Sequence, residues 1–379
     1  MSGAGVVDNS NMKRLPDFSS PLLAWYDENR RVLPWREEPT PYRVWVSEIM
    51  LQQTRVEAVK PYFARFMEEL PTVEALAACP PERLNKLWEG LGYYSRVRNM
   101  QKAAKTICHD FGGVIPSDPK ILLTLTGIGS YTAGAIASFA YGVAAPAVDG
   151  NVLRVLSRVL CDDRNILDPQ VKREYEGLIE AVIPKKRAGD YNQALIELGA
   201  TLCGPNSTPR CEECPLKEVC RGYQQNKQND LPIRAKKKPR RQEERTVLLI
   251  CDGKNVLLTR RGETGLLAGL YEFPCLDGIQ GENECLAFAR KMGLEPIKIK
   301  SVGKAKHIFT HIEWHMIGYE ITVGDTTLSV GSSLTVNGRE YVMADTQTLA
   351  DQYAVPSAYA KYLARFQVEK GSGRIKKQR

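Results

Sequence analysis

The sequence predicts a multidomain protein in which an all-α domain precedes a smaller α+β domain. A chain of 379 residues is too long for one typical hydrophobic core, so two domains and a linker are expected. From Ser20 to Leu202 apolar residues recur with the period of amphipathic helices, whereas from Thr246 onward they alternate or cluster as in β-strands. A polar, basic segment lies between the two patterns.

Seven segments of the first half carry the helical period, and Pro or Gly residues separate them. They are residues 22–31, 44–53, 59–70, 99–111, 131–141, 152–160 and 192–202. Short helices with short connections predict a helical domain over residues 18–202. Residues 1–17 lack the apolar run of a signal peptide and are expected to form a flexible leader.

The second half predicts an α+β domain over residues 245–368. Strands are expected at 246–251, 255–259, 297–302 and 315–323, and helices at 284–292 and 357–366. Residues 222–244 are polar and strongly basic, which predicts a linker, either solvated or lying on a polyanion. Residues 369–379 form a basic tail. The formal charge of +8 is compatible with a polyanionic partner but does not require one.

Four cysteines are concentrated in one short segment, residues 203–221. Thiolates so close together would repel one another or oxidise unless a metal held them. Zinc and a [4Fe–4S] cluster are both candidates, and one CxxC flanked by single cysteines favours the iron–sulfur cluster over the two CxxC pairs usual for zinc. The predicted ligands are Cys203, Cys211, Cys214 and Cys220.

A tight turn with two glycines, Gly127 and Gly129, joins two helical segments in LTGIGSYTA (125–133). Glycine permits a positive φ and a close approach of the backbone to a neighbour. Amides at the start of the following helix favour an anion, so the turn can hold a phosphate of DNA. An ordinary helix–helix connection would look similar.

Six motifs resemble the endonuclease III superfamily of helix–hairpin–helix glycosylases, most closely its MutY-type adenine-removing branch. They are LPWR (33–36), PYRVWVSEIMLQQTRV (41–56), LWEGLGYYSRVRN (87–99), LTGIGSYTAGAI (125–136), VDGNVLRVLSR (148–158) and YNQALIELGATLC (191–203). The resemblance implies an all-α helix–hairpin–helix glycosylase core with a [4Fe–4S] loop, followed by an α+β Nudix-like domain. Seven residues separate Cys203 from Cys211 where the family usually has six.

Cleaving an N-glycosidic bond requires an acid to protonate the base and a carboxylate to stabilise the cationic sugar. Glu48 lies beside Trp45, Ile49 and Met50, so it is either a buried acid with a raised pKa or a surface residue on a polar stripe. The resemblance makes Glu48 the proton donor to adenine N7.

Asp149 precedes a helix and is a natural N-cap. The resemblance places its carboxylate against the developing cation, through charge or a covalent intermediate, with Asn151 in support. Tyr131 stands where related enzymes that nick the backbone have a lysine. A phenol cannot form a Schiff base, so an abasic product with little strand cleavage is expected; simple packing is the other reading of Tyr131.

The resemblance also assigns residues that contact DNA or the base, although each of them alone would pass for a surface group. Arg31, Arg36 and Thr54 belong to the adenine pocket, with Gln193 a weaker candidate, and Gln53 and Tyr93 wedge into the duplex. HIFTHIEWH (307–315) matches a loop that probes oxidised guanine: Phe309 intercalates, and Thr310, where Ser is usual, and His311 form hydrogen bonds. His311 could instead be a buried structural histidine.

GLLAGLYEFP (265–274) resembles the entrance of a Nudix fold. The following helix, ECLAFARKMG (284–293), has too few carboxylates for the metal site of a Nudix hydrolase, which leaves a recognition role. The predicted function is therefore monofunctional removal of adenine mispaired with 8-oxoguanine or guanine. The alternatives are a bifunctional glycosylase/lyase for oxidised pyrimidines and a non-catalytic iron–sulfur DNA-binding protein.

The expected partner is double-stranded DNA containing 8-oxoguanine:A or G:A mispairs. We expect a monomer that does not enter a membrane, because no apolar run approaches the ~18 residues of a membrane helix. The linker is a candidate binding segment for other repair proteins. An intracellular protein, DNA-associated in a bacterial cytoplasm, is favoured, with the nucleus or mitochondrion left open.

Overall fold

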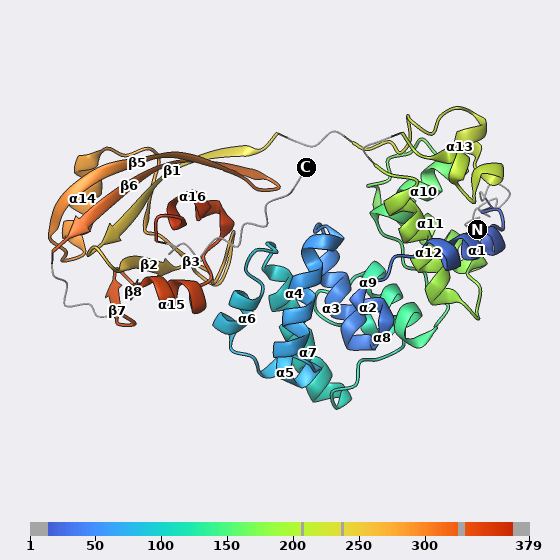
Figure 1. Ribbon diagram of the computed structural model, residues 1–379, viewed down its shortest axis with the longest axis horizontal. Coiled ribbons are helices and arrows are strands. Elements are labelled where there is room, and N and C mark those ends of the chain that lie inside the picture. Colours follow the sequence, from blue (N-terminus) through green and yellow to red (C-terminus); the bar gives the residue numbers. More distant parts are fainter. Residues whose placement is uncertain (1–13, 206–207, 236–238, 325–329, 367–379) are drawn as a thin grey trace, which may run out of the picture. The chain divides into compact units, whose positions relative to one another are not determined.

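The computed structural model describes residues 14–205, 208–235, 239–324 and 330–366. They divide into two compact units (Figure 1). The first holds the described residues up to Ala78 and those between Arg98 and Lys236, and the second holds Cys79–Val97 and the described residues after Lys237. The predicted basic tail (369–379) and residues 1–13 of the predicted leader lie outside the described part.

The described chain before residue 236 is helical, as the apolar period predicts. Its elements are α1 (Ser19–Asn29), α2 (Pro34–Glu37), α3 (Pro41–Leu51), α4 (Val56–Glu69), α5 (Val73–Ala78), α6 (Pro81–Leu87), α7 (Ser95–Phe111), α8 (Pro119–Leu122), α9 (Ser130–Ala135), the π-helical turn η2 (Ile136–Ala140), α10 (Gly150–Leu160), α11 (Pro169–Val182), α12 (Ala188–Thr201), the 3₁₀ turns η3 (Cys211–Glu213) and η4 (Lys217–Val219), and α13 (Arg221–Gln224). Each of the seven predicted helical segments coincides with a helix. The segment 131–141 divides into α9 and η2.

A buried apolar cluster joins α1, α10, α11 and α12 in the first unit. Leu22 of α1, Leu156 of α10, Tyr175 of α11 and Leu195 of α12 are all fully buried in it. α10 begins at the N-cap Asp149, whose side chain accepts hydrogen bonds from two backbone amides. This packing fixes the start of α10, and with it the position of Asp149.

The second unit contains an eight-stranded mixed sheet with the order β5-β6-β1-β2-β8-β7, in which β3 pairs with β2 and β4 with β1. β1 and β6 run parallel, and the other pairs are antiparallel. The strands are β1 (Arg241–Cys251), β2 (Val256–Arg260), β3 (Tyr271–Glu272), β4 (Cys275–Asp277), β5 (Pro296–Ile308), β6 (Ile312–Val323), β7 (Ser333–Val336) and β8 (Arg339–Ala344), and the helical elements are α14 (Glu282–Lys291), α15 (Thr346–Asp351), η5 (Ser357–Tyr359) and α16 (Ala360–Leu363).

Both faces of this sheet are covered, which explains the continuous apolar run of β1. Val247 and Leu249 point to one core with residues of α15, η5 and α16, while Leu248 and Ile250 point to another with residues of α14. Successive side chains of a strand alternate between faces, so a strand buried on both sides needs no polar residues.

Residues 79–97 group with the second unit rather than with the rest of the predicted helical domain (18–202). Lys86 Nζ donates hydrogen bonds to the carbonyl oxygens of Leu349 and Tyr353, at 3.3 and 3.2 Å. The amide of Val355 donates to a carboxylate oxygen of Glu89 at 3.0 Å. The residues that make these contacts are far apart in the sequence, so no local sequence pattern predicts them.

Two local expectations need correction. β1 begins at Arg241, inside the predicted linker (222–244), because its polar first residues pair along β6 from Ile312. The expected single helix at 357–366 is instead the 3₁₀ turn η5 followed by the short α16. Among the described residues, no helix combines the length and apolar character that crossing a membrane requires.

Candidate active site

One cavity of the first unit, of about 630 Å³, gathers all four predicted catalytic residues. That volume lies within the range of small-ligand pockets. Its lining includes the following predicted residues: Arg31, Arg36, Glu48, Gln53, Thr54, Tyr131, Asp149, Asn151 and Gln193. They come from five separate stretches of the sequence, and the helical packing brings them together.

Glu48 is buried on α3, with 7% of its surface exposed, so it is not a residue of a polar surface stripe. Burial raises the pKa of Glu48 to about 7; the nearby charge of Asp149 adds to this, while a hydrogen bond from Tyr131 and the charge of Arg36 oppose it. The hydroxyl of Tyr131, on α9, donates a hydrogen bond to Glu48 Oε2. Burial also raises the pKa of Tyr131 well above its usual value, so the phenol stays neutral and points at the carboxyl group.

Asp149 caps α10, as predicted. Its Oδ1 accepts from the amides of Asn151 and Val152 at 2.9 and 2.8 Å, and its Oδ2 accepts from Asn151 Nδ2 at 2.7 Å. Burial raises the pKa of Asp149, although these three hydrogen bonds act in the opposite direction. The Asn151 amide thus holds one oxygen of this carboxylate in place, and the supporting role in catalysis that the resemblance implies for Asn151 stays a prediction.

The structure adds a residue that the sequence prediction did not single out, Glu197 of α12. Its carboxylate is fully buried and accepts hydrogen bonds from both pocket arginines, Arg31 and Arg36. Its sequence signal was weak: a single acidic residue in the apolar run ALIELGA of the motif at 191–203. Lys172 of α11 also lines the cavity, and its Nζ donates to Ser130 Oγ at 3.0 Å.

The two hairpin glycines differ in what they need. Gly127 has φ +81°, and a Cβ there would lie 2.7 Å from Cβ of Asn99, so both its conformation and its space require glycine. Gly129 has an extended conformation, and no atom would lie within 4 Å of an added Cβ. Gly127 thus uses both properties that glycine offers this turn, whereas Gly129 uses neither and leaves open space at the N-cap of α9.

Gln53, which lines the cavity, has a strained backbone conformation. Its φ is +60°, a left-handed conformation that residues other than glycine rarely adopt. Strained backbone conformations persist only where the surrounding structure holds them, and they are concentrated at functional sites. Thr54 follows it and lines the same cavity.

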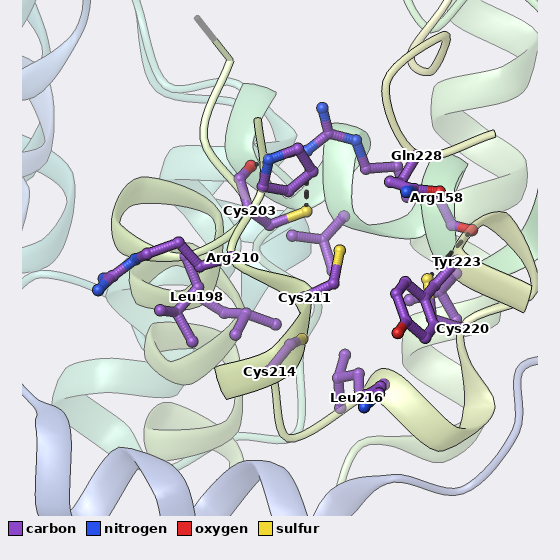
Figure 2. Close-up of a pocket in the computed structure, with 15 residues that line it drawn as sticks. Arg158, Leu198, Cys203, Arg210, Cys211, Cys214, Leu216, Cys220, Tyr223 and Gln228 are labelled. Carbon is purple, nitrogen blue, oxygen red and sulfur yellow. Dashed lines mark hydrogen bonds between the residues drawn. The ribbon is translucent and has the colours of Figure 1, made fainter. Parts of the chain in front are cut away.

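The four predicted cysteine ligands line one pocket beside α10 and α12, together with Arg158 and Leu198 (Figure 2). Burial raises the pKa of the Cys214 thiol to about 12 and that of Cys211 and Cys220 above the usual value, and neighbouring cysteines add to the effect. Arg158 Nη1 donates to Cys203 Sγ at 3.0 Å. Residues 206 and 207, which belong to the long first spacing, lie outside the described part.

A chain of hydrogen bonds leads from this pocket to the active site. Arg154 Nε donates to the Cys203 carbonyl oxygen at 2.8 Å, and Arg154 Nη2 donates to Asn151 Oδ1 at 2.9 Å. Asn151 in turn donates to Asp149. The cysteine loop and the orientation of Asp149 are thus structurally connected through Arg154.

In the second unit, the predicted loop Phe309–His311 connects β5 and β6. The Phe309 ring packs on Trp314 and His307, with centroid distances of 4.8 and 4.5 Å. Thr310 is exposed, and its hydroxyl lies 3.0 Å from the hydroxyl of Tyr93, which itself has φ +47°. His311 is exposed rather than buried, so the structural alternative for it is wrong.

The sequence of this chain is similar to known repair proteins along most of its length. Residues 46–181 match the HhH-GPD superfamily of base excision DNA repair proteins, and residues 246–365 match the NUDIX domain. A solved thermostable thymine-DNA glycosylase is 28% identical and has a TM-score of 0.50, covering 55% of this chain and 95% of that chain.

Similarity over about four-fifths of the chain is more specific. The adenine DNA glycosylase of Mus musculus is 35% identical over 362 residues, which cover 80% of this chain and 70% of the relative. That of Buchnera aphidicola subsp. Baizongia pistaciae is 33% identical and covers 84% of this chain and 90% of the relative. The buried Glu48, the capped Asp149 and the hairpin thus stand in a chain that is similar to these enzymes across both units. We conclude that the chain belongs to the adenine DNA glycosylase family: it is a DNA N-glycosylase that removes adenine in base excision repair.

Proposed function

We propose that the substrate is adenine mispaired with 8-oxoguanine or guanine in double-stranded DNA, and that Glu48 and Asp149 carry the cleavage. The observation that carries the proposal is the pairing of a buried Glu48, whose pKa is raised to about 7, with Asp149 in one cavity. Two carboxyl groups with different environments are what acid-assisted glycosidic cleavage requires.

The reaction follows from these positions. Adenine leaves the base stack and enters the cavity, since no side chain reaches it inside the duplex. Glu48 gives its proton to N7, the N-glycosidic bond breaks, and its electron pair leaves with adenine. The Asp149 carboxylate stabilises the cationic sugar, and water then adds to it. Tyr131 offers a phenol and no amine, which supports an abasic product without strand cleavage.

The pH dependence of excision tests the acid role of Glu48. Because its pKa is raised to about 7, the carboxyl group is protonated below that pH and ionised above it. The single-turnover rate should therefore hold up to about pH 7 and then fall by about tenfold per pH unit. A rate that stays flat from pH 6 to pH 9 would contradict a proton donor of this pKa.

The cysteine pocket is proposed to hold a [4Fe–4S] cluster through Cys203, Cys211, Cys214 and Cys220. These four cysteines line one pocket, and their sequence pattern, one CxxC flanked by single cysteines, favours a cluster over zinc. A zinc site needs its ligands around one ion, whereas a cluster distributes four thiolates over four irons. The Arg158 guanidinium at Cys203 Sγ suits an anionic group. When bound, the cluster would supply a redox-active, structure-holding centre.

Metal analysis of the purified protein tests this cofactor. We expect about four irons and four acid-labile sulfides per chain, and much less of both in a Cys214→Ser variant. Cys108→Ser is the matched control, because Cys108 lies on α7 outside the pocket. One zinc per chain, with no sulfide, would refute the assignment.

Recognition of the opposite base is proposed for Phe309, Thr310 and His311, with Tyr93 alongside. The exposed Thr310 beside an exposed, left-handed Tyr93 supports a joint contact with one nucleotide. Arg31, Arg36, Gln53, Thr54 and Gln193 are proposed to contact the flipped adenine or the vacated stack, and Gly127 and Gly129 a phosphate. We propose that the enzyme acts as a monomer, and that the part of the predicted linker that precedes β1 connects the two units.

A Thr310→Ala variant should lose discrimination between 8-oxoguanine:A and G:A duplexes. Loss of one base-edge hydrogen bond costs about 1–3 kcal/mol, so the preference should fall by about tenfold while the maximal rate is retained. Competition between the two duplexes under single-turnover conditions measures it. Thr335→Ala is the control, since Thr335 is exposed on β7. An unchanged preference in T310A would remove this residue from recognition.

A further inference from the structure

Two arginines line the adenine cavity, and one buried carboxylate holds them both. Glu197 accepts from Arg31 Nε and, at 3.1 Å, from Arg31 Nη2; its Oε2 also accepts from Arg36 Nη2 at 2.8 Å. The Glu197 side chain is fully buried, whereas those of Arg31 and Arg36 are 38% and 16% exposed. The two partly exposed guanidinium groups are therefore both held by the buried carboxylate of Glu197.

A second contact locks the pair. Arg36 Nη1 donates to the Arg31 carbonyl oxygen at 3.2 Å, so the two arginines are coupled to each other as well as to Glu197. Burial acts to raise the pKa of Glu197, but the two arginines outweigh it and the pKa lies below its usual range. Glu197 is thus a carboxylate, and a buried charge of this kind persists only when it is paired.

The charge of Glu197 matters for Glu48. Arg36 is close enough to lower the pKa of Glu48, which works against keeping the acid protonated. Glu197 cancels one of the two positive charges in this wall. The other ionisable groups that line the cavity with Glu48 are Tyr131 on α9, Asp149 at the start of α10 and Lys172 on α11. The uncharged polar side chains of its lining are Ser47, Gln52, Gln53, Thr54, Asn151 and Gln193.

We propose that Glu197 is a positioning residue of adenine excision, which clamps Arg31 and Arg36 against the base and screens Glu48 from the positive charge of Arg36. The proposal rests on the proposed acid role of Glu48. The carboxylate of Glu197 would then have two separable effects. Its position holds the two arginines in place, and its negative charge keeps Glu48 protonated near neutral pH.

Two substitutions separate these effects. Glu197→Gln keeps the shape and removes the charge, so the alkaline midpoint of the pH–rate profile should move down by about one pH unit. At pH 8 that shift alone lowers the rate by about tenfold. Glu197→Asp keeps the charge but is one methylene shorter, so its midpoint should stay near that of the wild type while the low-pH rate falls about tenfold through misplaced arginines.

The control is Asp162→Asn. Asp162 is also buried and pairs with an arginine, Arg164, but it does not line the cavity. Because Asp162 has only a structural role, Asp162→Asn should lower the midpoint of thermal unfolding and leave the midpoint of the pH–rate profile unchanged. Iron content and thermal unfolding are measured for every variant, so that rates refer to folded, loaded protein.

A folded Glu197→Gln enzyme with the wild-type midpoint would overturn the screening role. A Glu197→Asp enzyme with the wild-type rate at low pH would contradict the role of Glu197 in holding the two arginines. This measurement does not depend on whether the Glu197→Gln protein folds. A Glu48→Gln enzyme is measured in parallel. Activity and an unchanged profile there would defeat the acid role of Glu48 itself, which is a different failure from that of Glu197.

Discussion

Replacing Glu48 with Gln should slow adenine excision by about 10³-fold at pH 7. The amide is nearly isosteric and still accepts the hydrogen bond that Tyr131 donates, so the fold and the cavity should be retained. It has no proton of suitable acidity to give to adenine, and the leaving group must then depart unprotonated. The loss should appear in the maximal rate rather than in DNA affinity, because the interaction is made in the transition state.

Single-turnover excision with enzyme in excess measures this loss, and binding of the same duplex is measured beside it. Glu174→Gln is the control, because Glu174 pairs with exposed Arg164 and does not line the cavity; its rate should stay within about twofold of the wild type. If Glu48→Gln kept more than about a tenth of the wild-type rate, Glu48 would not be the general acid.

Asp149→Asn should lower the maximal rate by about 10²–10³-fold while leaving the fold nearly unchanged. Asn is as good an N-cap as Asp, so the two backbone amides that Asp149 holds remain bonded. What disappears is the negative charge that faces the cationic sugar. Because Asp149 also raises the pKa of Glu48, the alkaline limb of the pH–rate profile should move to lower pH.

Thermal unfolding and single-turnover rates across pH 5–9 measure both effects. Asp168→Asn is the matched control: Asp168 caps α11 by accepting from the amide of Gln170, and it lies outside the cavity. An Asp149→Asn protein that unfolds like the wild type and also excises adenine like the wild type would limit Asp149 to its capping role.

Much of this architecture could be predicted from local patterns. The helical period located α3, α10 and α12, and the spacing of four cysteines located the pocket that these cysteines line. Asp149 was recognisable as an N-cap because capping depends on neighbouring residues only. Both faces of α3 carry apolar residues, so the period alone could not decide whether Glu48 faced solvent or core.

The remainder depends on contacts between distant parts of the chain. Glu197 is separated from Arg31 by 166 residues, so no window of sequence shows that they pair. The edge strand β7 and the two-residue β3 are too short for a visible alternation. α11 lies outside the seven predicted segments, although its Asp168-Pro169 start and its apolar spacing are ordinary helix signals.

The most direct test of the central claim is the product formed from an end-labelled duplex that carries one 8-oxoguanine:A pair. Each sample is divided after incubation with the purified protein, and one half receives hot alkali before electrophoresis. We expect cleavage at the adenine in the alkali-treated half alone, and none with Glu48→Gln, because the enzyme leaves an intact strand with an abasic site. Strand cleavage without alkali would contradict the monofunctional mechanism, and an uncut duplex that iron-loaded protein nevertheless binds would contradict the proposed substrate.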